Sequence, residues 1–301
     1  MLAIVIPYYK FPFFDATLQS LAAQTDKRFK VYIGNDGSPE DPLPLLEKYQ
    51  VQFDFVYHRF KTNLGLSSLV QQWNRCVALT GSEEWIMILG DDDVIEDSVV
   101  ASWYKNYPIF NEKSNVVRFA SKVITEETGT VSHIYMHPVW EAATDSFYRK
   151  FEYETRSSLS EYVFSKASFL KYGFHNYHSG WYSDDKAWID FAGNKPIFSI
   201  NESVVFIRNS LLNISSRKDN LELKNKAEIV FYRFMILNKM NFYKKVQRLK
   251  LIRKYEDSIK KLRNLTVREW LLLTFFYLKF FDSYSLKKFI KRLVKNVLRY
   301  E

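Results

Sequence analysis

WIMILGDDD, residues 85–93, joins an apolar run to a strongly charged end. Its first five residues indicate a strand buried in a core. Asp91, Asp92 and Asp93 follow side by side, and their charges repel one another. Capping the next helix would need only one of them. Alternate carboxylates, Asp91 and Asp93, are suited to share Mg²⁺ or Mn²⁺, with phosphate oxygens and water in the remaining positions.

Outward from this strand, short apolar runs alternate with longer amphipathic ones over the first 120 residues. Alternation at this spacing predicts an α/β fold with a parallel sheet, because parallel strands need crossover helices between them. The predicted strands are 2–6, 30–33, 53–57, 85–89 and 116–119. The predicted helices are 13–23, 43–49, 66–79 and 97–110.

Polar segments lie where three of these strands end. Pro7 and Tyr8 follow the first strand, Asn35-Asp36-Gly37-Ser38 follows the second, and the three aspartates follow the fourth. Open α/β sheets bind ligands in the crevice beyond the carboxyl ends of their strands. Asn-Asp-Gly-Ser is by itself an ordinary turn signature. At this position, however, Asp36 is suited to accept hydrogen bonds from a nucleobase or a ribose.

A second acidic pair, Asp184 and Asp185, lies in GWYSDDKAWIDFA, residues 180–192. At the predicted start of a helix these carboxylates can act as caps and interact with the helix dipole. An enzyme with a metal at the first cluster would also need a separate base, and this pair offers one. The pair alone does not decide between the two roles. The surrounding pattern predicts irregular structure over 121–160 with a hairpin at 127–129, helices over 165–172 and 184–192, and strands over 196–200 and 204–207.

Composition and charge bound the class of protein. The chain has 301 residues, is 47% hydrophobic and holds one cysteine, so we expect a well-filled globular core without an intrachain disulfide. The N-terminus reads as a strand rather than a signal peptide. No apolar run reaches the roughly 18 residues of a membrane-spanning helix. Residues 222–301 hold 21 basic and 7 acidic side chains, net +14, which leaves a net charge of −5 for residues 1–221.

Several of these segments form a longer ordered pattern. In chain order they are Ile4-Val5-Ile6-Pro7-Tyr8-Tyr9, Leu18-Gln19-Ser20-Leu21-Ala22-Ala23-Gln24-Thr25, Asn35-Asp36-Gly37-Ser38, Asn63-Leu64-Gly65, Trp73-Asn74 and Leu89-Gly90-Asp91-Asp92-Asp93-Val94-Ile95. Together they resemble the family 2 glycosyltransferases of the GT-A fold, over roughly residues 2–210. The resemblance implies a mixed, mainly parallel sheet flanked by helices in a catalytic domain over 1–215. A basic, aromatic-rich helical region would follow over 216–301.

The resemblance also implies roles for individual residues. Asp36 would lie on the base of a donor nucleotide. Asp91 and Asp93 look like the two ends of the family's D-x-D signature, which holds Mn²⁺ or Mg²⁺ on the diphosphate. Asp184-Asp185 resembles the family's late E-D pair, whose second member is the catalytic base, so Asp185 is our candidate base. The residues implied for donor binding are Pro7, Tyr8, Asp36, Asn63, Trp73, Asp91, Asp92 and Arg208.

The sequence departs from the family pattern at three points. Gln72-Trp73-Asn74 stands where many relatives have Ala-Arg-Asn, so a donor-contacting arginine is missing and Arg75 comes one position late. Gly90 replaces a frequent Asp, and Asp184 replaces the more usual Glu. The first departure bears on the identity of the donor, whereas the other two leave the mechanism intact.

The implied reaction is a single displacement at the anomeric carbon of a nucleotide sugar. Asp185 would remove the proton from an acceptor hydroxyl while the metal stabilises the departing diphosphate. No second carboxylate is singled out as a nucleophile, so we expect an inverting enzyme of the hexosyltransferase type. A UDP-sugar is the expected donor, and a saccharide or lipid-linked saccharide the expected acceptor, in bacterial cell-surface polysaccharide synthesis.

The basic tail indicates a further contact. Over residues 285–300 apolar side chains follow helical spacing, with Lys and Arg between them. Basic amphipathic helices of this kind suit an anionic membrane surface. The alternative is a helix that packs on the catalytic domain or on a second subunit of a homo-oligomer. Membrane contact would place a cytoplasmic protein at the inner face of the cytoplasmic membrane.

Three other classes of protein share parts of this pattern. A nucleic-acid-binding protein would explain the pI of about 9.3, but the basic charge avoids the half of the chain with the ordered segments, so we expect no nucleic-acid partner. A nucleotidyltransferase also uses carboxylates in an α/β crevice, yet the glycine-rich basic loop expected after its first strand is absent. A non-catalytic scaffold with a degenerate site would keep the fold without nucleotide affinity.

Overall fold

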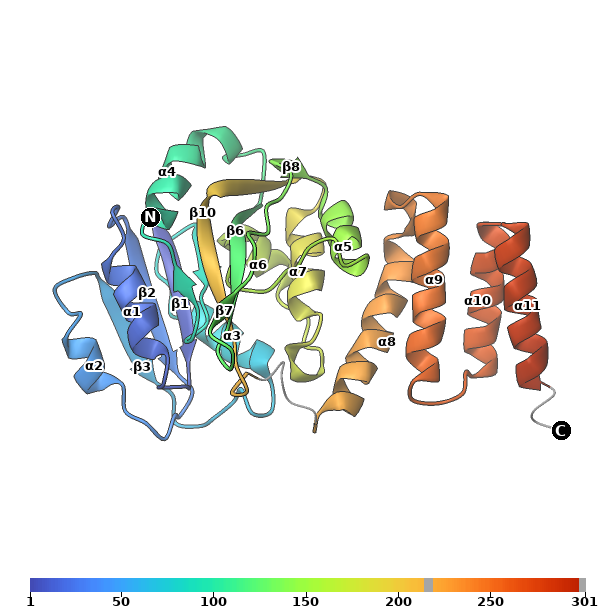
Figure 1. Ribbon diagram of the computed structural model, residues 1–301, viewed down its shortest axis with the longest axis horizontal. Helices are drawn as coiled ribbons and strands as arrows, with labels where there is room; N and C mark the ends of the chain where they lie inside the picture. The colour runs from blue at the N-terminus through green and yellow to red at the C-terminus, as the bar shows by residue number, and fades with distance from the viewer. Residues whose placement is uncertain (214–218, 298–301) are drawn as a thin grey trace. The chain divides into compact units, whose positions relative to one another are not determined.

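The computed structural model describes residues 1–213 and 219–297. The chain forms two compact units, Met1–Lys218 and Asp219–Glu301 (Figure 1). The predicted boundary between residues 215 and 216 falls in the segment 214–218, outside the described residues. All of the predicted site residues belong to the first unit.

A ten-stranded sheet forms the centre of the first unit. Its strands are β1 Leu2–Tyr8, β2 Phe29–Asn35, β3 Phe55–Arg59, β4 Trp85–Ile88, β5 Val94–Ile95, β6 Val116–Thr125, β7 Thr130–Val131, β8 Trp140–Glu141, β9 Tyr162–Ser165 and β10 Ile197–Asn209. The main order is β3-β2-β1-β4-β9-β6-β10-β5. The pairs β1–β2, β1–β4, β2–β3 and β6–β10 are parallel, and those made by β5, β7, β8 and β9 are antiparallel. The predicted mixed sheet is confirmed, and its longest pairings, β6–β10 and β1–β2, are parallel.

Helices cover both faces of this sheet (Figure 1). They are α1 Phe14–Ala22, α2 Leu43–Glu47, α3 Leu69–Val77, α4 Val99–Phe110, α5 Ala143–Phe151, α6 Lys166–Tyr172 and α7 Ser183–Ala192, with a 3₁₀ turn η1 at His178–Gly180. Side chains of a strand alternate between its two faces. Leu2, Ile4 and Ile6 therefore join α1, α2 and α4 in one apolar core. On the other face α3 packs on β1 and β2, where Cys76 lies against Gly34.

Residues 121–165 contain more regular structure than the sequence predicts. The expected irregular segment holds α5, whose buried residues are Ala143, Thr144, Ser146 and Phe147. Except for Phe147 these residues are small or polar, so they give no clear apolar period. β9 was also missed, because it is short and gains its structure from antiparallel pairing with β4 and β6. The predicted hairpin is present between β6 and β7.

β10 is one strand where the sequence predicts two. It runs through Ile197–Asn209, and its register with β6 shifts between Ile200 and Val204. The polar residues that interrupt the apolar pattern at this point form an irregularity within the strand rather than a turn. The continuous strand carries Arg208 to the end of the sheet where β1 and β4 also end.

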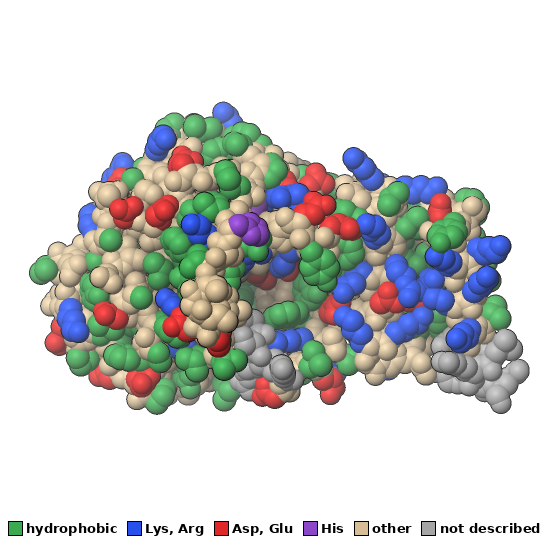
Figure 2. Space-filling model, viewed as in Figure 1, with side chains coloured by type: hydrophobic (Ala, Val, Ile, Leu, Met, Phe, Trp, Pro, Cys, Tyr) green, Lys and Arg blue, Asp and Glu red, His purple; other side chains and the backbone are tan. Residues whose placement is uncertain are grey.

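Within residues 219–297, the second unit consists mainly of four helices. They are α8 Leu221–Asn238, α9 Lys245–Lys260, α10 Val267–Lys279 and α11 Ser283–Val297, with a 3₁₀ turn η3 at Met240–Phe242. Each helix packs on the next one in the chain. Lys and Arg side chains are spread over the face of these helices that Figure 2 shows.

The basic amphipathic helix predicted over 285–300 corresponds to α11, and residues 298–301 lie outside the described residues. Part of its apolar side packs within this unit, since Phe289 is buried and stacks on Tyr277 with ring centroids 4.5 Å apart. Ile290 and Val294 remain exposed. The apolar period of this helix therefore serves internal packing in part.

Candidate active site

Backbone amides at the end of β1 hold Asp91 in place. The amides of Tyr9 and Lys10 donate to Asp91 Oδ2 at 2.7 and 2.6 Å. The parallel pairing of β1 with β4 brings the ends of these two strands together. On its other side, Asp91 Oδ1 lies 3.6 Å from Lys10 Nζ. Asp91 thus has one oxygen bound by backbone amides and the other directed toward the Lys10 ammonium.

Asp93 interacts with a different part of the chain. Its Oδ1 accepts from the backbone amide of Arg208 at 2.8 Å, and its Oδ2 accepts from the hydroxyl of Ser160. Arg208 lies near the end of β10, and Ser160 comes two residues before β9. The end of β4 therefore collects groups from segments that are far apart in the sequence.

Asp92 completes the acidic loop. Lys10 Nζ donates to Asp92 Oδ2, and Arg208 Nε donates to the Asp92 carbonyl at 3.0 Å. Burial and the neighbouring charge of Asp92 raise the pKa of Asp91 to about 6, although Lys10 opposes the shift. Burial and Asp92 likewise raise the pKa of Asp93 to about 7. The loop holds more negative charge than its surroundings neutralise.

This donor set fits a divalent cation that shares its ligands with a phosphate. Mg²⁺ is usually bound through one or two carboxylates, with substrate phosphates and water in the other positions. Asp91 and its neighbours offer hard oxygen ligands whose charge is incompletely balanced. Within residues 1–213 and 219–297, no group of three or more His, Cys, Asp or Glu side chains is arranged to hold a metal by itself.

Asp36 is enclosed by amides and an arginine at the end of β2. Its Oδ1 accepts from the amide of Leu64 at 2.7 Å and from Arg75, and its Oδ2 accepts from the amide of Gly65 at 2.8 Å. A Cβ on Gly65 would lie 2.6 Å from Oδ2, so this approach requires a glycine. Asp36 thus fixes the loop before α3, and both of its oxygens accept hydrogen bonds from the protein.

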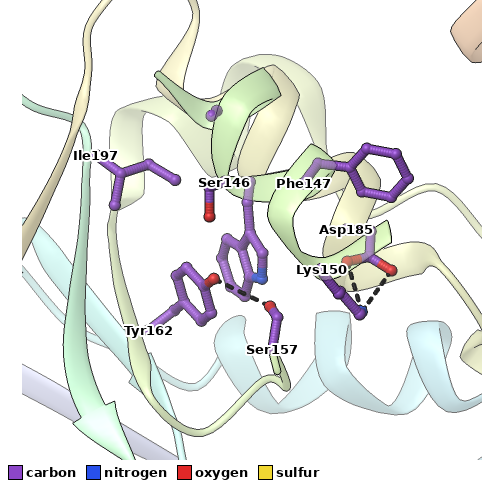
Figure 3. Close-up of a pocket in the computed structure, with 9 residues that line it drawn as sticks. Ser146, Phe147, Lys150, Ser157, Tyr162, Asp185 and Ile197 are labelled. Atoms are coloured by element: carbon purple, nitrogen blue, oxygen red, sulfur yellow. Dashed lines mark hydrogen bonds and ion pairs between the residues drawn. The ribbon is translucent and has the colours of Figure 1, made fainter. Parts of the chain in front are cut away.

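Asp185 forms a buried ion pair at the start of α7. Lys150 Nζ donates to its two carboxylate oxygens at 2.7 and 2.8 Å (Figure 3). Burial alone would lower the pKa of Lys150, but Asp185 and Asp184 raise it above its ordinary value. Burial and Asp185 raise the pKa of Asp184 to about 7. The Asp185 carboxylate, a group able to accept a proton, therefore lies beside the Lys150 ammonium, whose raised pKa keeps it positively charged.

Comparison with known proteins identifies the family. The model of Glycosyl transferase family 2 matches residues 3–155, about half of the chain. The chain belongs to glycosyl transferase family 2. The matched range includes the ends of β1, β2 and β4 with their aspartates. The predicted family is confirmed.

Two further similarities agree with a family 2 glycosyltransferase. The uncharacterized glycosyltransferase YfnE of Bacillus subtilis (strain 168) is 23% identical over 161 residues, which are 53% of this chain and 35% of that protein. The chain thus spans about a third of the length of this relative. The structure of S. aureus TarS 1–349 in complex with UDP-GlcNAc has a TM-score of 0.64 at 15% identity, covering 93% of this chain and 80% of that one. A longer TarS structure has a TM-score of 0.62 at 13% identity, covering 94% and 50%.

These structures confirm the predicted GT-A fold. The part of the chain described by the structure contains no helix that is both long and apolar enough to cross a membrane.

Arg75 supplies an arginine near Asp36, although it lies one position after the arginine that is missing from this family 2 chain. From one position further along α3, its guanidinium reaches Asp36 and lies 3.9 Å from the centre of the Phe60 ring. Trp73, which occupies the position of the expected arginine, packs edge-on against Phe174 with ring centroids 5.5 Å apart. It also lies against Gly180, in the loop before the second acidic pair. An arginine is thus present near Asp36, whereas Trp73 contacts the other side of the site.

Tyr8 is placed differently from the other predicted donor-binding residues. Its side chain is 0% exposed and packs on Phe14 with ring centroids 4.6 Å apart. Burial raises its pKa to about 12. The ring is therefore part of the core, which leaves only the backbone of Tyr8 to face a donor. Pro7 is half-buried, and Asn63 Oδ1 accepts from the amide of Leu66 at 2.8 Å.

Three residues of this site were not singled out from the sequence. They are Lys10 beside Asp91 and Asp92, Ser160 on Asp93, and Lys150 on Asp185. Lys10 carried a signal, since it directly follows the Pro7-Tyr8-Tyr9 segment at a strand end. Ser160 and Lys150 carried none, because both lie in or beside the segment predicted to be irregular.

A small cleft lies beside Asp185 and Lys150 (Figure 3). Trp188 and Tyr162 line it and stack with ring centroids 4.3 Å apart and 10° between their planes. The hydroxyls of Tyr162 and Ser157 are 3.0 Å apart at its edge. Trp188 Nε1 is buried and has no hydrogen-bond partner among the described residues. The cleft thus offers an aromatic face, hydroxyl groups and a buried donor next to the candidate base.

Proposed function

We propose that this protein is a metal-dependent, inverting glycosyltransferase that moves a sugar from a nucleotide diphosphate donor to a hydroxyl of a saccharide or lipid-linked saccharide. Its pathway would be the synthesis of bacterial cell-surface polysaccharide. The observation that carries the proposal is the meeting of Asp91, Asp92 and Asp93 with Lys10 and Arg208 where β1, β4 and β10 end. TarS has been solved with UDP-GlcNAc and with UDP, which supports a UDP-sugar as the donor.

The donor diphosphate would lie at the acidic loop. Asp91 and Asp93 are the proposed metal ligands, with Asp92 beside them. When bound there, Mg²⁺ or Mn²⁺ supplies positive charge that stabilises the departing diphosphate. Asp36 would bind the base or ribose, in a position fixed by the amides of the loop before α3. Arg208, whose Nε already binds the Asp92 carbonyl, would lie close to the phosphates.

Asp185 is the proposed general base, with Asp184 as its acidic neighbour. Lys150 fixes the orientation of the Asp185 carboxylate through two hydrogen bonds. A carboxylate oxygen has a second lone pair, which an acceptor hydroxyl can use while Lys150 stays bound. A single base on the acceptor side, without a nucleophile on the opposite side of the sugar, leads to inversion at the anomeric carbon.

The second unit supports the proposal of a lipid-linked acceptor at the inner face of the cytoplasmic membrane. Four large apolar side chains are exposed along α10: Val267, Leu271, Phe275 and Leu278. At 100° per residue they fall on one side of the helix. Basic side chains of α11 are also exposed. Apolar residues together with exposed lysines suit an anionic lipid surface. Co-sedimentation with anionic but not with neutral vesicles would support this contact, and concentration-dependent self-association would favour a homo-oligomer.

A thermal-shift panel tests the proposed transferase. Nucleoside diphosphates and nucleotide sugars would be added to the full chain with and without Mn²⁺. We expect stabilisation by UDP or a UDP-sugar that depends on Mn²⁺ and is lost in Asp93→Ala. Glu222→Ala, which removes an exposed carboxylate from α8, is the matched control and should respond like the wild type. If no nucleotide stabilises the protein under any condition, the proposed function is wrong.

A further inference from the structure

Lys10 ends in a small cage of oxygen atoms. Its Nζ donates to Asp92 Oδ2, lies 3.6 Å from Asp91 Oδ1 and donates to Asn213 Oδ1 at 3.3 Å. Asn213 is itself held in place, because its Nδ2 donates to the Arg208 carbonyl at 2.6 Å and its Oδ1 accepts from Ser210 at 3.0 Å. The ammonium therefore sits in a built environment rather than on an open surface.

The cage has the chemistry of a hard-cation site. Carboxylate and amide oxygens are the ligands that Mg²⁺ and related cations take in proteins. Two of the three cage oxygens belong to the acidic loop that we propose as the metal site. An ammonium on Asp91 and Asp92 and a divalent cation on Asp91 and Asp93 would share Asp91 and repel each other strongly, because the three aspartates are buried.

The ammonium of Lys10 is also able to move out of the cage. Its side chain is 23% exposed, whereas those of Asp91 and Asp92 are 6% and 9% exposed. Four flexible methylene groups separate the ammonium from the backbone, so Nζ can move while the amide of Lys10 stays bound to Asp91. The anchoring hydrogen bond and the ion pair are therefore independent of each other.

We propose that Lys10 is an internal cation that competes with the divalent metal for the acidic loop, where it holds Asp91, a proposed metal ligand, and the adjacent Asp92. In the absence of nucleotide its ammonium occupies the cage, so metal alone binds weakly. An arriving diphosphate offers the displaced ammonium new anionic oxygens, so metal and nucleotide bind best together. Lys10 is in this sense a positioning residue that couples the two ligands. The inference rests on the proposed metal-dependent function and specifies what limits metal binding when no nucleotide is bound.

Calorimetric titration of the full chain with Mn²⁺, without nucleotide, tests this competition. In Lys10→Met the competitor is gone, and we expect Mn²⁺ to bind about tenfold more tightly than in the wild type, as when a binding-competent state rises from about a tenth to all of the population. Lys10→Arg keeps the positive charge and should bind Mn²⁺ as weakly as the wild type. Lys30→Met is the matched control, since it removes a lysine paired with Asp54 at 3.2 Å on another part of the unit.

A second titration with UDP present measures the coupling. UDP should strengthen Mn²⁺ binding more in the wild type than in Lys10→Met. Mn²⁺ affinity that is unchanged or weaker in Lys10→Met would overturn the competition, even if UDP and Mn²⁺ stabilise the wild type as the proposed function requires. If the wild type and both Lys10 variants fail to bind Mn²⁺ even with UDP, the metal-dependent function itself is wrong. Circular dichroism of each variant establishes that it is folded.

Discussion

Glu256 in the second unit and the Asp91–Asp93 loop in the first are both buried, yet their charges are balanced to very different extents. Glu256 is 0% exposed and binds Arg292 at 2.7 and 2.8 Å, together with Arg253 at 3.1 Å and Lys260. Burial alone would raise its pKa, but these cations hold the pKa below its ordinary value. In the loop, Asp91 and Asp92 share the ammonium of Lys10, and Asp93 accepts from the Ser160 hydroxyl and the Arg208 amide. Burial raises the pKa of Asp91 to about 6 and of Asp93 to about 7.

The number of neighbouring cations distinguishes buried carboxylates that stabilise the fold from those suited to bind a cationic ligand. A buried carboxylate with its own cations can remain charged without outside help. A buried carboxylate with too few cations carries an electrostatic cost that a bound cation can remove, and such perturbed groups cluster at functional sites. Burial by itself therefore does not distinguish the two roles, whereas the balance of charge does.

Asp91→Asn should give the largest effect. The Asn side chain can still accept from the amides of Tyr9 and Lys10, but it no longer offers a charged ligand. We expect transferase activity to fall about 10²- to 10³-fold, as when one charge-stabilising group is removed from an active site. Initial rates with the nucleotide sugar found by thermal shift would measure this, and the melting temperature should not fall. A clear drop in melting temperature together with the loss of activity would show that Asp91 stabilises the fold, as Glu256 does.

Glu256→Gln should do the reverse. It removes the fully buried charge that Arg292, Arg253 and Lys260 share, although these three cations are themselves partly exposed. We expect a loss of about 3 kcal/mol in the free energy of unfolding. Urea denaturation followed by circular dichroism would measure the loss. Binding of UDP with Mn²⁺ at temperatures where the variant is folded should match the wild type. Unchanged urea stability in this variant would contradict the structural role.

Asp184→Asn tests how a half-buried carboxylate with too few neighbouring cations changes the pH dependence of stability. The folded-state pKa of Asp184 is raised to about 7 from 3.8. The folded protein therefore binds the proton more tightly than the unfolded chain, and this group makes the wild type less stable as pH rises from about 4 to about 7. Asn cannot ionise, and the full shift corresponds to about 4 kcal/mol. Because Asp184 is only half-buried, solvent screens part of this, so the variant should gain about 2 kcal/mol over the wild type at pH of about 8 and little at pH of about 4. Melting curves across this range give the difference, and a gain independent of pH would refute the assignment.

Glu269→Gln should have the smallest effect. Hydrogen bonds from Arg263 at 2.7 and 2.8 Å lower the pKa of Glu269 to about 2 against the effect of burial. A lowered pKa stabilises the fold above about pH 4.5, and this contribution is lost as pH falls toward about 2. Arg263 is about half exposed, so solvent screens the pair and the variant should lose about 0.5 kcal/mol at neutral pH. A loss near that of Glu256→Gln in the same urea experiment would show that exposure does not weaken such pairs.

The sequence predicted the parts of the site that depend on local pattern. The strand ends and the aspartates could be located because apolar runs, turn residues and acidic clusters follow one another along the chain. Ser160 and Lys150 could not be found this way, since long-range pairing of β9 and the packing of the weakly patterned α5 bring them to Asp93 and Asp185. The burial of Tyr8 could have been anticipated, because it shares its strand face with Ile4 and Ile6.

The short strand β9 also sets a distance. Ser160, just before it, binds Asp93, and Tyr162, its first residue, stacks on Trp188 beside Asp185. Ser160 lies in the turn that leads into β9, where the amide of Tyr162 donates to the Leu159 carbonyl at 3.3 Å, so the two residues are held close together. A slip of one residue in the pairing of β9 with β4 and β6 would withdraw both contacts together. β9 therefore couples the position of Asp93, our proposed metal ligand, to that of the cleft beside Asp185, our proposed base. In the proposed reaction its register would set the gap between the departing diphosphate and the attacking hydroxyl.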